Sequence, residues 1–240
     1  MTSSTVDEEN LREFTSRADQ WWDLEGAFKP LHDLNPVRID FILSEISKAF
    51  NLESKAFETL SILDVGCGGG LVTEPLARTG AVITGLDAGV ENITVAESHA
   101  REEGLDIQYV CSPLESFFPD KLFDVVIALE IVEHVSCVDT FITNCFRVLK
   151  PNGIVIFSTL NRTAKSFVLG IVAAEYILRW VPRGTHSWEQ FLKPSELARS
   201  ARYAGGTPKT LKGMAYHPFL KRWSLSDNCE VNYFFVTQKK

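Results

Sequence analysis

The sequence predicts an α/β fold in which helices cover both faces of a doubly wound, mostly parallel sheet. Two observations predict this fold. From residue 61 onward, short apolar runs rich in β-branched residues alternate with helical stretches, which is the pattern of parallel strands joined by crossover helices. A glycine-rich turn also follows the first of these runs directly. We expect residues 1–240 to form a single domain, because no long linker interrupts them.

Residues 1–50 predict a helical cap at the N-terminal end of this domain. Residues 1–10 are polar, and we expect them to fray. Apolar side chains then recur near helical spacing up to the pair Trp21 and Trp22. A second helix is expected from about Pro36, after the break KPLHDLNP. We expect the tryptophan pair to pack this cap onto the core, because large aromatic side chains mainly serve burial.

Residues 60–160 predict the core of the sheet. Five apolar runs in this region have the length and composition of buried strands. These runs cover residues 61–66, 81–87, 107–112, 123–130 and 153–160. The turn KPNG at residues 150–153 is expected to end the helix that precedes the fifth strand.

The last third of the chain predicts a helical insertion followed by closing strands. Residues 161–200 have the pattern of helices rather than of strands. Residues 205–240 contain two further apolar runs, 209–219 and 231–240, which we expect to form the last strands of the sheet.

Composition and charge are typical of a globular cytoplasmic protein. Hydrophobic residues make up 45% of the chain and charged residues 23%. No signal peptide or membrane-spanning run is evident, and the five cysteines contain no CxxC pair, so we expect neither a disulfide framework nor a zinc site. The net charge of −7 argues against a nucleic-acid partner, because nucleic-acid binding depends on basic contacts to phosphates.

The segment SILDVGCGGG, residues 61–70, ends one strand and opens a helix. Gly66 and Gly68 allow the backbone to turn tightly and to approach a ligand closely. Asp87 ends the next predicted strand, where a carboxylate can accept hydrogen bonds from a ribose diol. Strand, glycines and second acid together predict the nucleotide-binding turn of a Rossmann-like sheet.

Asp64 indicates the charge of the bound nucleotide. A carboxylate two residues before the first glycine would repel a diphosphate, whereas it would attract a cationic ligand. The pattern D-x-G-x-G-x-G resembles motif I of class I methyltransferases, whose methyl donor is the sulfonium compound S-adenosyl-L-methionine. The resemblance implies that Gly66 and Gly68 contact this cofactor, that Asp87 holds its ribose, and that Leu129 lines it through the backbone.

Several further stretches resemble one family, the ubiquinone-biosynthesis O-methyltransferases, which methylate polyprenylated hydroxyphenols. They are WWDLEGAFKPLHDLNPVR, LEIVEHV, STLNRTAKS, AEYILRWVPRGTHSWEQFLKP and VNYFFVTQK, and together they cover nearly the whole chain. The resemblance adds Arg38 to the cofactor contacts, and a guanidinium suits a carboxylate such as that of the methionyl group.

Glu130, Glu133 and His134 follow the fourth predicted strand at i, i+3 and i+4. A helix starting near residue 130 would place all three on one face, at the end of the sheet where ligands bind. The nucleophile in methyl transfer should be a phenolate, yet a phenol with a pKa near 10 is only about one part in a thousand ionised at neutral pH. The three residues suit a hard divalent ion that would bind the phenolic oxygen, or a general base that would take the proton.

The residue types alone therefore allow two catalytic roles for Glu130, Glu133 and His134, metal binding and base catalysis, besides a structural role as a helix cap. The resembled family carries an E-x-x-E-H motif that binds Mg²⁺, which implies that Glu130, Glu133 and His134 are metal ligands. The alternative is direct base catalysis by His134 or one of the glutamates.

Residues 161–222 contain 11 Lys and Arg against 3 Asp and Glu, a basic segment on an acidic body. Within it, residues 161–184 have an apolar run flanked by basic and aromatic side chains, which suits a helix lying in a membrane interface. A core-facing helix has the same pattern. The resemblance favours the membrane, because a polyprenyl tail must be drawn from lipid.

The sequence thus predicts an S-adenosylmethionine-dependent O-methyltransferase acting on 2-polyprenyl-6-hydroxyphenol and 3-demethylubiquinol in ubiquinone biosynthesis. Its expected partners are the prenylated substrate, an anionic membrane surface and other ubiquinone-biosynthesis proteins. We expect a cytoplasmic location with peripheral association to the inner membrane. The alternatives are a non-catalytic cofactor-binding scaffold of a biosynthetic complex and an NAD-dependent dehydrogenase on a similar fold, against which Asp64 argues.

Overall fold

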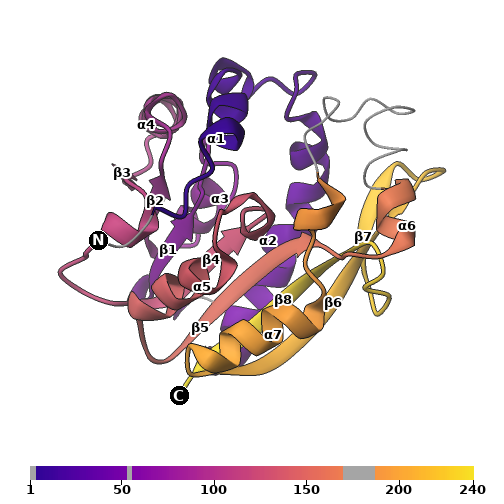
Figure 1. Ribbon diagram of the computed structural model, residues 1–240. Coiled ribbons are helices and arrows are strands. Elements are labelled where there is room, and N and C mark those ends of the chain that lie inside the picture. The colour runs from indigo at the N-terminus through magenta and orange to yellow at the C-terminus, as the bar shows by residue number, and fades with distance from the viewer. Residues whose placement is uncertain (1–3, 53–55, 170–186) are drawn as a thin grey trace.

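The computed structural model describes residues 4–52, 56–169 and 187–240, and one eight-stranded sheet forms its centre (Figure 1). The strands lie in the order β3-β2-β1-β4-β5-β8-β6-β7. The first five are parallel to one another, and the last three run antiparallel to their neighbours. Their bounds are β1 Ser61–Val65, β2 Val82–Asp87, β3 Gln108–Cys111, β4 Phe123–Leu129, β5 Leu149–Leu160, β6 Gly206–His217, β7 Arg222–Ser226 and β8 Asn232–Lys239.

All five predicted core strands are present, but the fifth begins earlier than expected. The preceding helix ends at Arg147, and β5 already starts at Leu149, so the KPNG segment lies inside the strand. The pairing of β4 with β5 shifts register there, and Asn152 has a φ of 62°. The expected helix-ending turn is therefore a bulge within a strand, where an asparagine tolerates the left-handed backbone.

Three strands close the sheet instead of the expected two. The runs expected at 209–219 and 231–240 correspond to β6 and β8. The additional strand, β7, pairs only with β6 and forms one edge of the sheet. Its sequence RWSLS is short and largely polar, as edge strands often are, and this explains why no apolar run marked it.

Seven α-helices lie in the described part of the chain. They are α1 Glu8–Thr15, α2 Lys29–Phe50, α3 Thr73–Ala77, α4 Val90–Glu102, α5 Val138–Arg147, α6 Ala164–Ser166 and α7 Pro194–Tyr203. Short 3-10 helices are η1 Ala18–Gln20, η2 Ala56–Thr59, η3 Leu114–Ser116, η4 Val132–His134 and η6 Trp188–Gln190. Of the expected helical insertion, α6 and the first part of α7 are described, whereas residues 170–186 lie outside the described residues.

The second cap helix starts at Lys29 and not near Pro36, which was the expected start. The segment KPLHDLNP forms the first turns of α2, with Pro30 where a missing N–H costs nothing and Pro36 tolerated inside the helix. Burial of Leu34 and Phe41 on this helix outweighs the local preference to break at proline.

Strand β4 shows how the two faces of the sheet are covered. Val126 and Ala128 pack toward α5 and α7, whereas Val125 and Ile127 pack toward α2 and α3. This alternation follows from the two-residue period of a strand, and Figure 1 shows helices on both sides of the sheet. The strand order reverses between β1 and β4, and doubly wound sheets bind ligands at the carboxyl ends of the strands at such a reversal.

The N-terminal residues from position 4 are held in place, although residues 1–10 were expected to fray. The Thr5 N–H and hydroxyl both donate hydrogen bonds to the Glu115 carboxylate, at 2.5 Å and 2.9 Å. Val6 forms a β-bridge with Val135, in the loop that follows β4. The expectation was wrong because the partners of this segment are distant in sequence.

Candidate active site

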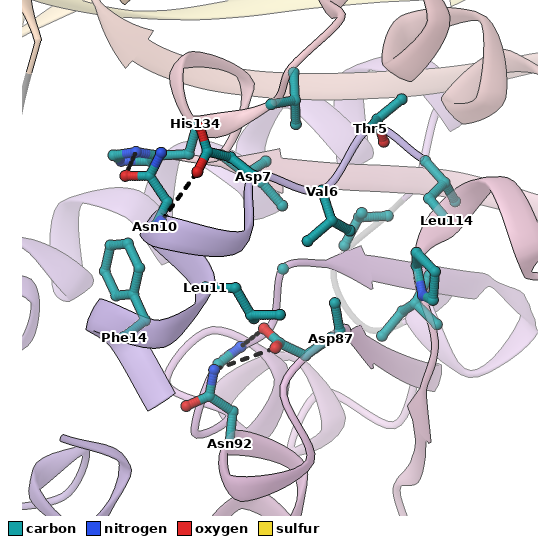
Figure 2. A pocket seen from close by; sticks show the side chains of 18 of the residues that line it. Thr5, Val6, Asp7, Asn10, Leu11, Phe14, Asp87, Asn92, Leu114 and His134 are labelled. Carbon is teal, nitrogen blue, oxygen red and sulfur yellow. Dashed lines mark hydrogen bonds between the residues drawn. The ribbon is translucent and has the colours of Figure 1, made fainter. Parts of the chain in front are cut away.

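A cavity of about 140 Å³ lies at the carboxyl ends of β1, β2 and β4, where the strand order reverses. The sheet side of it is lined by Val65, Gly66, Gly68, Leu86, Asp87, Glu130, Ile131 and His134. The opposite wall comes from the N-terminal segment and includes Thr5, Val6, Asp7, Asn10, Leu11 and Phe14 (Figure 2). The cavity therefore joins the predicted cofactor loop to two of the three predicted catalytic residues.

The glycine loop adopts a backbone that only glycine fits well. Gly66 and Gly68 have φ angles of 73° and 53°, in the left-handed region. A Cβ on Gly68 would lie 2.4 Å from the Trp21 ring, and one on Gly66 would lie 2.5 Å from Ile131. The loop is thus packed tightly between the cap and the loop after β4, with its backbone turned toward the cavity.

Asp87 at the tip of β2 points into the cavity, as the sequence predicted. Its carboxylate accepts hydrogen bonds from the Gly68 N–H at 3.0 Å, the Gly89 N–H at 2.8 Å and the Asn92 amide at 3.1 Å. Burial raises the pKa of Asp87 above its ordinary value, and these three donors partly offset that increase. The side chain is therefore held in one orientation, which a ribose-binding acid requires.

Asp64 lies beneath the glycine loop and does not line the cavity. It is 3% exposed and accepts a hydrogen bond from the Thr73 hydroxyl at 2.6 Å. Burial raises its pKa to about 6, although the Thr73 hydrogen bond opposes this. At this position Asp64 does not contact a bound cofactor directly. Its charge still acts on the cavity, because the protein interior between them has a low dielectric constant.

Arg38 and Leu129 also lie behind the cavity wall. Arg38 on α2 is 4% exposed, and its guanidinium forms an ion pair with Glu130 at 3.2 Å. Its Nε is a buried donor without a hydrogen-bond partner, which is the condition of a group that awaits an anionic ligand. Leu129 ends β4 and packs toward α2.

The predicted helix that would carry Glu130, Glu133 and His134 on one face does not form. Glu130 has a φ of 50°, and only a 3-10 turn, Val132–His134, follows it. The chain must turn sharply there because Glu130 still donates its N–H to Ser158 of the neighbouring strand. The Glu130 carboxylate accepts a hydrogen bond from the Ser158 hydroxyl at 2.7 Å.

Glu133 and His134 point away from one another after this turn. Glu133 is 3% exposed; its Oε2 accepts a hydrogen bond from the Thr159 hydroxyl at 2.9 Å, whereas its Oε1 has no hydrogen-bond partner. The His134 ring lies at the cavity wall, with its Nδ1 3.2 Å from the Asn10 side chain and its edge against Phe14.

The charge of Glu130 disfavours the ionised form of Glu133. Burial, together with the charge of Glu130, raises the pKa of Glu133 to about 8. Within the described ranges, no group of three His, Cys, Asp or Glu side chains converges to hold a metal ion as the side chains stand. These side chains still suit a divalent cation. A positive charge would stabilise the ionised forms of the neighbouring Glu130 and Glu133 carboxylates and would give the buried Glu133 Oε1 a partner.

Sequence reasoning missed the N-terminal wall of the cavity and two polar positions, Asn92 and Ser112. Asn92 connects the cap to the cofactor acid, since it accepts a hydrogen bond from Trp21 at 2.9 Å and donates one to Asp87. Leu11 and Phe14 were visible as the apolar face of a helix, but nothing in the pattern indicated that this face covers a cavity.

Comparisons with known proteins identify the family. Residues 63–157 match the family model described as a methyltransferase domain. A ubiquinone biosynthesis O-methyltransferase from Paramagnetospirillum magneticum is 45% identical over 238 residues, which are 98% of this chain and 96% of that protein. Another from Cereibacter sphaeroides is 46% identical over an alignment of 244 positions that covers 100% of this chain and 99% of that protein. The chain belongs to the ubiquinone biosynthesis O-methyltransferase family.

Solved structures of more distant proteins share the fold of this ubiquinone biosynthesis O-methyltransferase family member. A magnesium protoporphyrin IX methyltransferase from Synechocystis with bound SAH has a TM-score of 0.68 at 18% identity, covering 98% of this chain and 100% of that one. A structure of the same protein with bound SAM has a TM-score of 0.63 at 15% identity, covering 100% of both chains. The predicted doubly wound methyltransferase fold is confirmed.

Family membership also confirms the predicted enzyme class and cofactor: the chain is an S-adenosylmethionine-dependent O-methyltransferase. The dehydrogenase and the non-catalytic scaffold are not favoured. Within the described part of the chain, no helix combines the length and the apolar character needed to cross a membrane.

Proposed function

We propose that the chain transfers a methyl group from S-adenosylmethionine to a phenolic hydroxyl of polyprenylated ubiquinone precursors, namely 2-polyprenyl-6-hydroxyphenol and 3-demethylubiquinol. The observation that carries the proposal is the single cavity wall that joins Gly66, Gly68 and Asp87 to Glu130 and His134. Such a wall brings a methyl donor and a residue set suited to a phenol within reach of one another.

The cofactor roles follow from the positions of the residues. Gly66 and Gly68 would lie against the cofactor with their backbone, and Asp87 would accept hydrogen bonds from its ribose. Arg38, with its free buried donor, would move from Glu130 toward the methionyl carboxylate. Asp64 would favour the positive charge of the donor without touching it.

For the phenol, we propose Glu130, Glu133 and His134 as ligands of a divalent cation such as Mg²⁺. Such an ion supplies a Lewis acid that lowers the pKa of a phenolic oxygen bound to it. The crowded carboxylates and the unpartnered Glu133 Oε1 support this assignment. His134 would offer its Nε2 while its Nδ1 keeps the contact with Asn10, and Glu130 would exchange its ion pair with Arg38, which the cofactor carboxylate would then take over.

A second candidate mechanism uses the same side chains without an ion. In this mechanism His134, whose ring lies at the cavity wall, or one of the two glutamates would accept the phenolic proton directly. The two candidate mechanisms use the same residues, but only the first requires a divalent cation from solution.

Single-turnover methyl transfer to a short-chain demethylquinol analogue tests the proposal. We expect product with wild type, and a loss of at least about 100-fold with Glu133→Gln. Activity that EDTA abolishes and Mg²⁺ restores supports the metal, and unchanged activity in EDTA supports the base. No methyl transfer from wild type under either condition would overturn the proposed reaction.

We further propose that the enzyme contacts an anionic membrane, at the cytoplasmic face of the inner membrane, through residues 161–184. Most of this segment, residues 170–184, lies outside the described residues. At its start, Phe167, Val168 and Leu169 are each about half exposed, which is unusual for consecutive apolar residues.

A hairpin tip strengthens the membrane proposal. The β6–β7 hairpin extends past the point where β5 ends its pairing with β8, on the side of the sheet that carries the cavity. At its tip, Phe219 is fully exposed and Leu220 is 61% exposed, and Lys221 and Arg222 follow. Apolar side chains next to basic ones suit an anionic lipid surface.

Co-sedimentation with phosphatidylglycerol vesicles, compared with neutral vesicles, tests this contact. We expect preferential binding to the anionic vesicles, reduced by Arg179→Glu with Arg183→Glu and by Lys221→Glu with Arg222→Glu. The double variant Lys121→Glu with Lys240→Glu is the matched control, because it changes the same charge at the opposite end of the strands from the cavity. Equal sedimentation with both vesicle types would remove the membrane proposal.

A further inference from the structure

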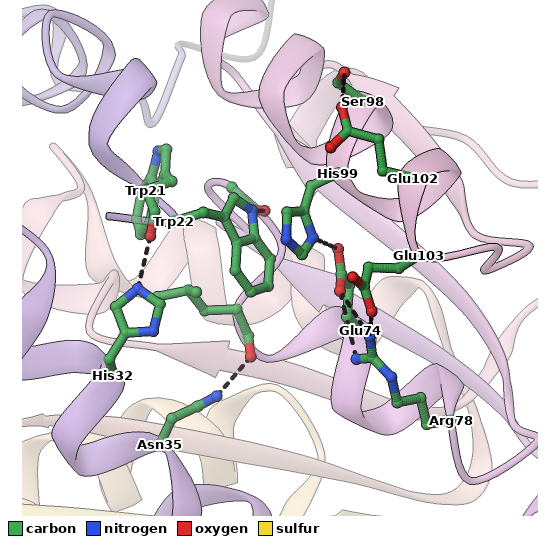
Figure 3. Close-up of polar contacts among 12 residues, drawn as sticks. Trp21, Trp22, His32, Asn35, Glu74, Arg78, Ser98, His99, Glu102 and Glu103 are labelled. Carbon is green, nitrogen blue, oxygen red and sulfur yellow. Dashed lines mark hydrogen bonds and ion pairs between the residues drawn. The ribbon is translucent and has the colours of Figure 1, made fainter. Parts of the chain in front are cut away.

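A buried acid on helix α3, Glu74, has no part in the proposed chemistry. Its side chain is fully buried, and its carboxylate accepts a hydrogen bond from His99 Nδ1 at 2.6 Å. The Arg78 guanidinium lies 3.4 Å from its other oxygen (Figure 3). A buried carboxylate costs considerable free energy unless it is paired, so its retention here calls for an explanation.

The partner of this acid, His99, is stacked on a tryptophan of the cap. The rings of His99 and Trp22 lie parallel, with centroids 3.5 Å apart and an interplanar angle of 4°. Because the Nδ1–H of His99 is directed at Glu74, the imidazole cannot rotate freely, and its plane fixes that of the indole. Figure 3 shows the three side chains in one line.

The indole in turn holds the cofactor loop. Trp22 donates its Nε1–H to the carbonyl oxygen of Gly69 at 2.9 Å. Gly69 directly follows Gly68, which lines the cavity and donates its N–H to Asp87. The peptide that Trp22 grips is therefore one residue from the backbone expected to touch the methyl donor.

Two neighbouring contacts show that the cap holds this loop at several points. Asn35 of α2 donates to the Leu71 carbonyl at 2.6 Å, and the Trp21 ring covers Gly68. Trp22 adds a hydrogen bond to Gly69, which lies between Gly68 and Leu71 in the loop. A glycine-rich loop has many accessible conformations. Hydrogen bonds from outside the loop therefore determine the fraction of molecules in which it adopts the conformation that binds the cofactor.

We infer that Trp22 is a positioning residue for the methyl donor, oriented by the buried Glu74–His99 pair. The ligand it serves is the adenosyl compound of the proposed function, on which the inference rests. The role is preorganisation: the network holds the glycine loop in the conformation that binds the cofactor, and it does not contact the acceptor or the reacting atoms.

The central test is Trp22→Phe, which keeps most of the stacking area and removes only the N–H donor. We expect the Kd for S-adenosylhomocysteine, measured by calorimetry, and the KM for S-adenosylmethionine to rise by about 3- to 10-fold, with kcat within twofold of wild type. His99→Ala and Glu74→Gln should raise the same two constants. The effects of Trp22→Phe and His99→Ala should combine non-additively, because both act through one contact.

Glu103→Gln is the matched control. The Glu103 carboxylate binds the outer side of Arg78 at 2.7 Å, and the bond that joins Glu103 to His99 runs from its backbone N–H to the His99 carbonyl oxygen at 2.9 Å, which Glu103→Gln keeps. It should leave the Kd, the KM and the kcat unchanged. An unchanged Kd in Trp22→Phe would overturn the inference. A parallel decrease in affinity, kcat and melting temperature in all variants would also overturn it, because it would indicate general destabilisation.

The test also separates this inference from the proposed function. If wild type fails to bind S-adenosylhomocysteine, the proposed function itself is wrong. If wild type binds it and Trp22→Phe binds it equally well, the function stands and only the role of Trp22 is wrong.

Discussion

Thr73 donates a hydrogen bond of 2.6 Å to Asp64 and holds this buried acid beneath the glycine loop. Burial raises the pKa of Asp64 to about 6, so the carboxyl group is largely neutral below pH 6 and ionised above it. Only the ionised form attracts a cationic cofactor. We therefore expect Asp64, although it does not line the cavity, to make cofactor binding depend on pH.

The first prediction follows from the ionisation of Asp64 as the pH rises. The affinity for S-adenosylmethionine should increase by up to about tenfold between pH 5 and pH 7, because binding a cation favours the ionised form of Asp64. Calorimetry across this range measures it. Asp64→Asn should bind more weakly at pH 7 and lose most of the pH dependence, and S-adenosylhomocysteine, which lacks the sulfonium charge, should show less of it. The same slope in wild type and Asp64→Asn would contradict this account.

Glu133→Gln should separate stability from activity. The substitution removes a buried carboxyl group whose charge is disfavoured by burial and by Glu130, and the amide keeps its shape. We expect methyl transfer to fall while the melting temperature at pH 8 stays the same or rises by about a few degrees. Thermal denaturation of both proteins checks this. Should the variant melt well below wild type, Glu133 would have a structural role instead.

Gly68→Ala should damage both the fold and cofactor binding. An alanine would have to adopt a φ of 53°, and its Cβ would lie 2.4 Å from the Trp21 ring. We expect a loss of about 1–3 kcal/mol in the free energy of unfolding, together with weaker binding of S-adenosylhomocysteine. Gly104→Ala is a useful comparison, because it also has a positive φ, of 66°, yet no atom lies within 4 Å of its Cβ. The comparison variant should lose less stability and keep its affinity.

The contact between Thr5 and Glu115 should control the release of the cofactor. Thr5 and several residues up to Phe14 line one wall of the cavity, so we expect a bound cofactor to dissociate more slowly while this segment is in place. We expect Glu115→Ala to accelerate dissociation of S-adenosylhomocysteine several-fold, as followed by stopped-flow fluorescence. Hydrogen exchange of the N-terminal amides should increase in parallel. Glu9→Gln, on the exposed side of α1, should change neither rate.

Much of the site was predictable from local sequence patterns. Gly66 and Gly68 lie in the turn after β1 and Asp87 ends β2, and the carboxyl ends of parallel strands meet at one end of a sheet. The apolar runs that mark these strands are buried on both faces, which makes them the clearest signals in the chain. The local pattern therefore predicted that Gly66, Gly68 and Asp87 lie together at the cavity, and their contacts with the cofactor stay predictions.

Errors occurred where a distant contact overrides the local pattern. Glu130, Glu133 and His134 have helical spacing, yet Glu130 is drawn out of a helix by its bonds to Ser158 on β5 and by its ion pair with Arg38. The N-terminal residues have no local reason to be ordered, but Glu115 provides one. Neither contact leaves a periodic signal.

The sequence by itself determined the fold class, the cofactor loop and its acid, and the family, because these depend on residues close together in the chain or on a pattern spread along all of it. The tertiary structure decided which wall closes the cavity, how the two carboxylates after β4 share their surroundings, and how the cap grips the glycine loop. The physical reason is that burial and hydrogen bonding between remote segments set charge, orientation and access, and no local pattern encodes these properties.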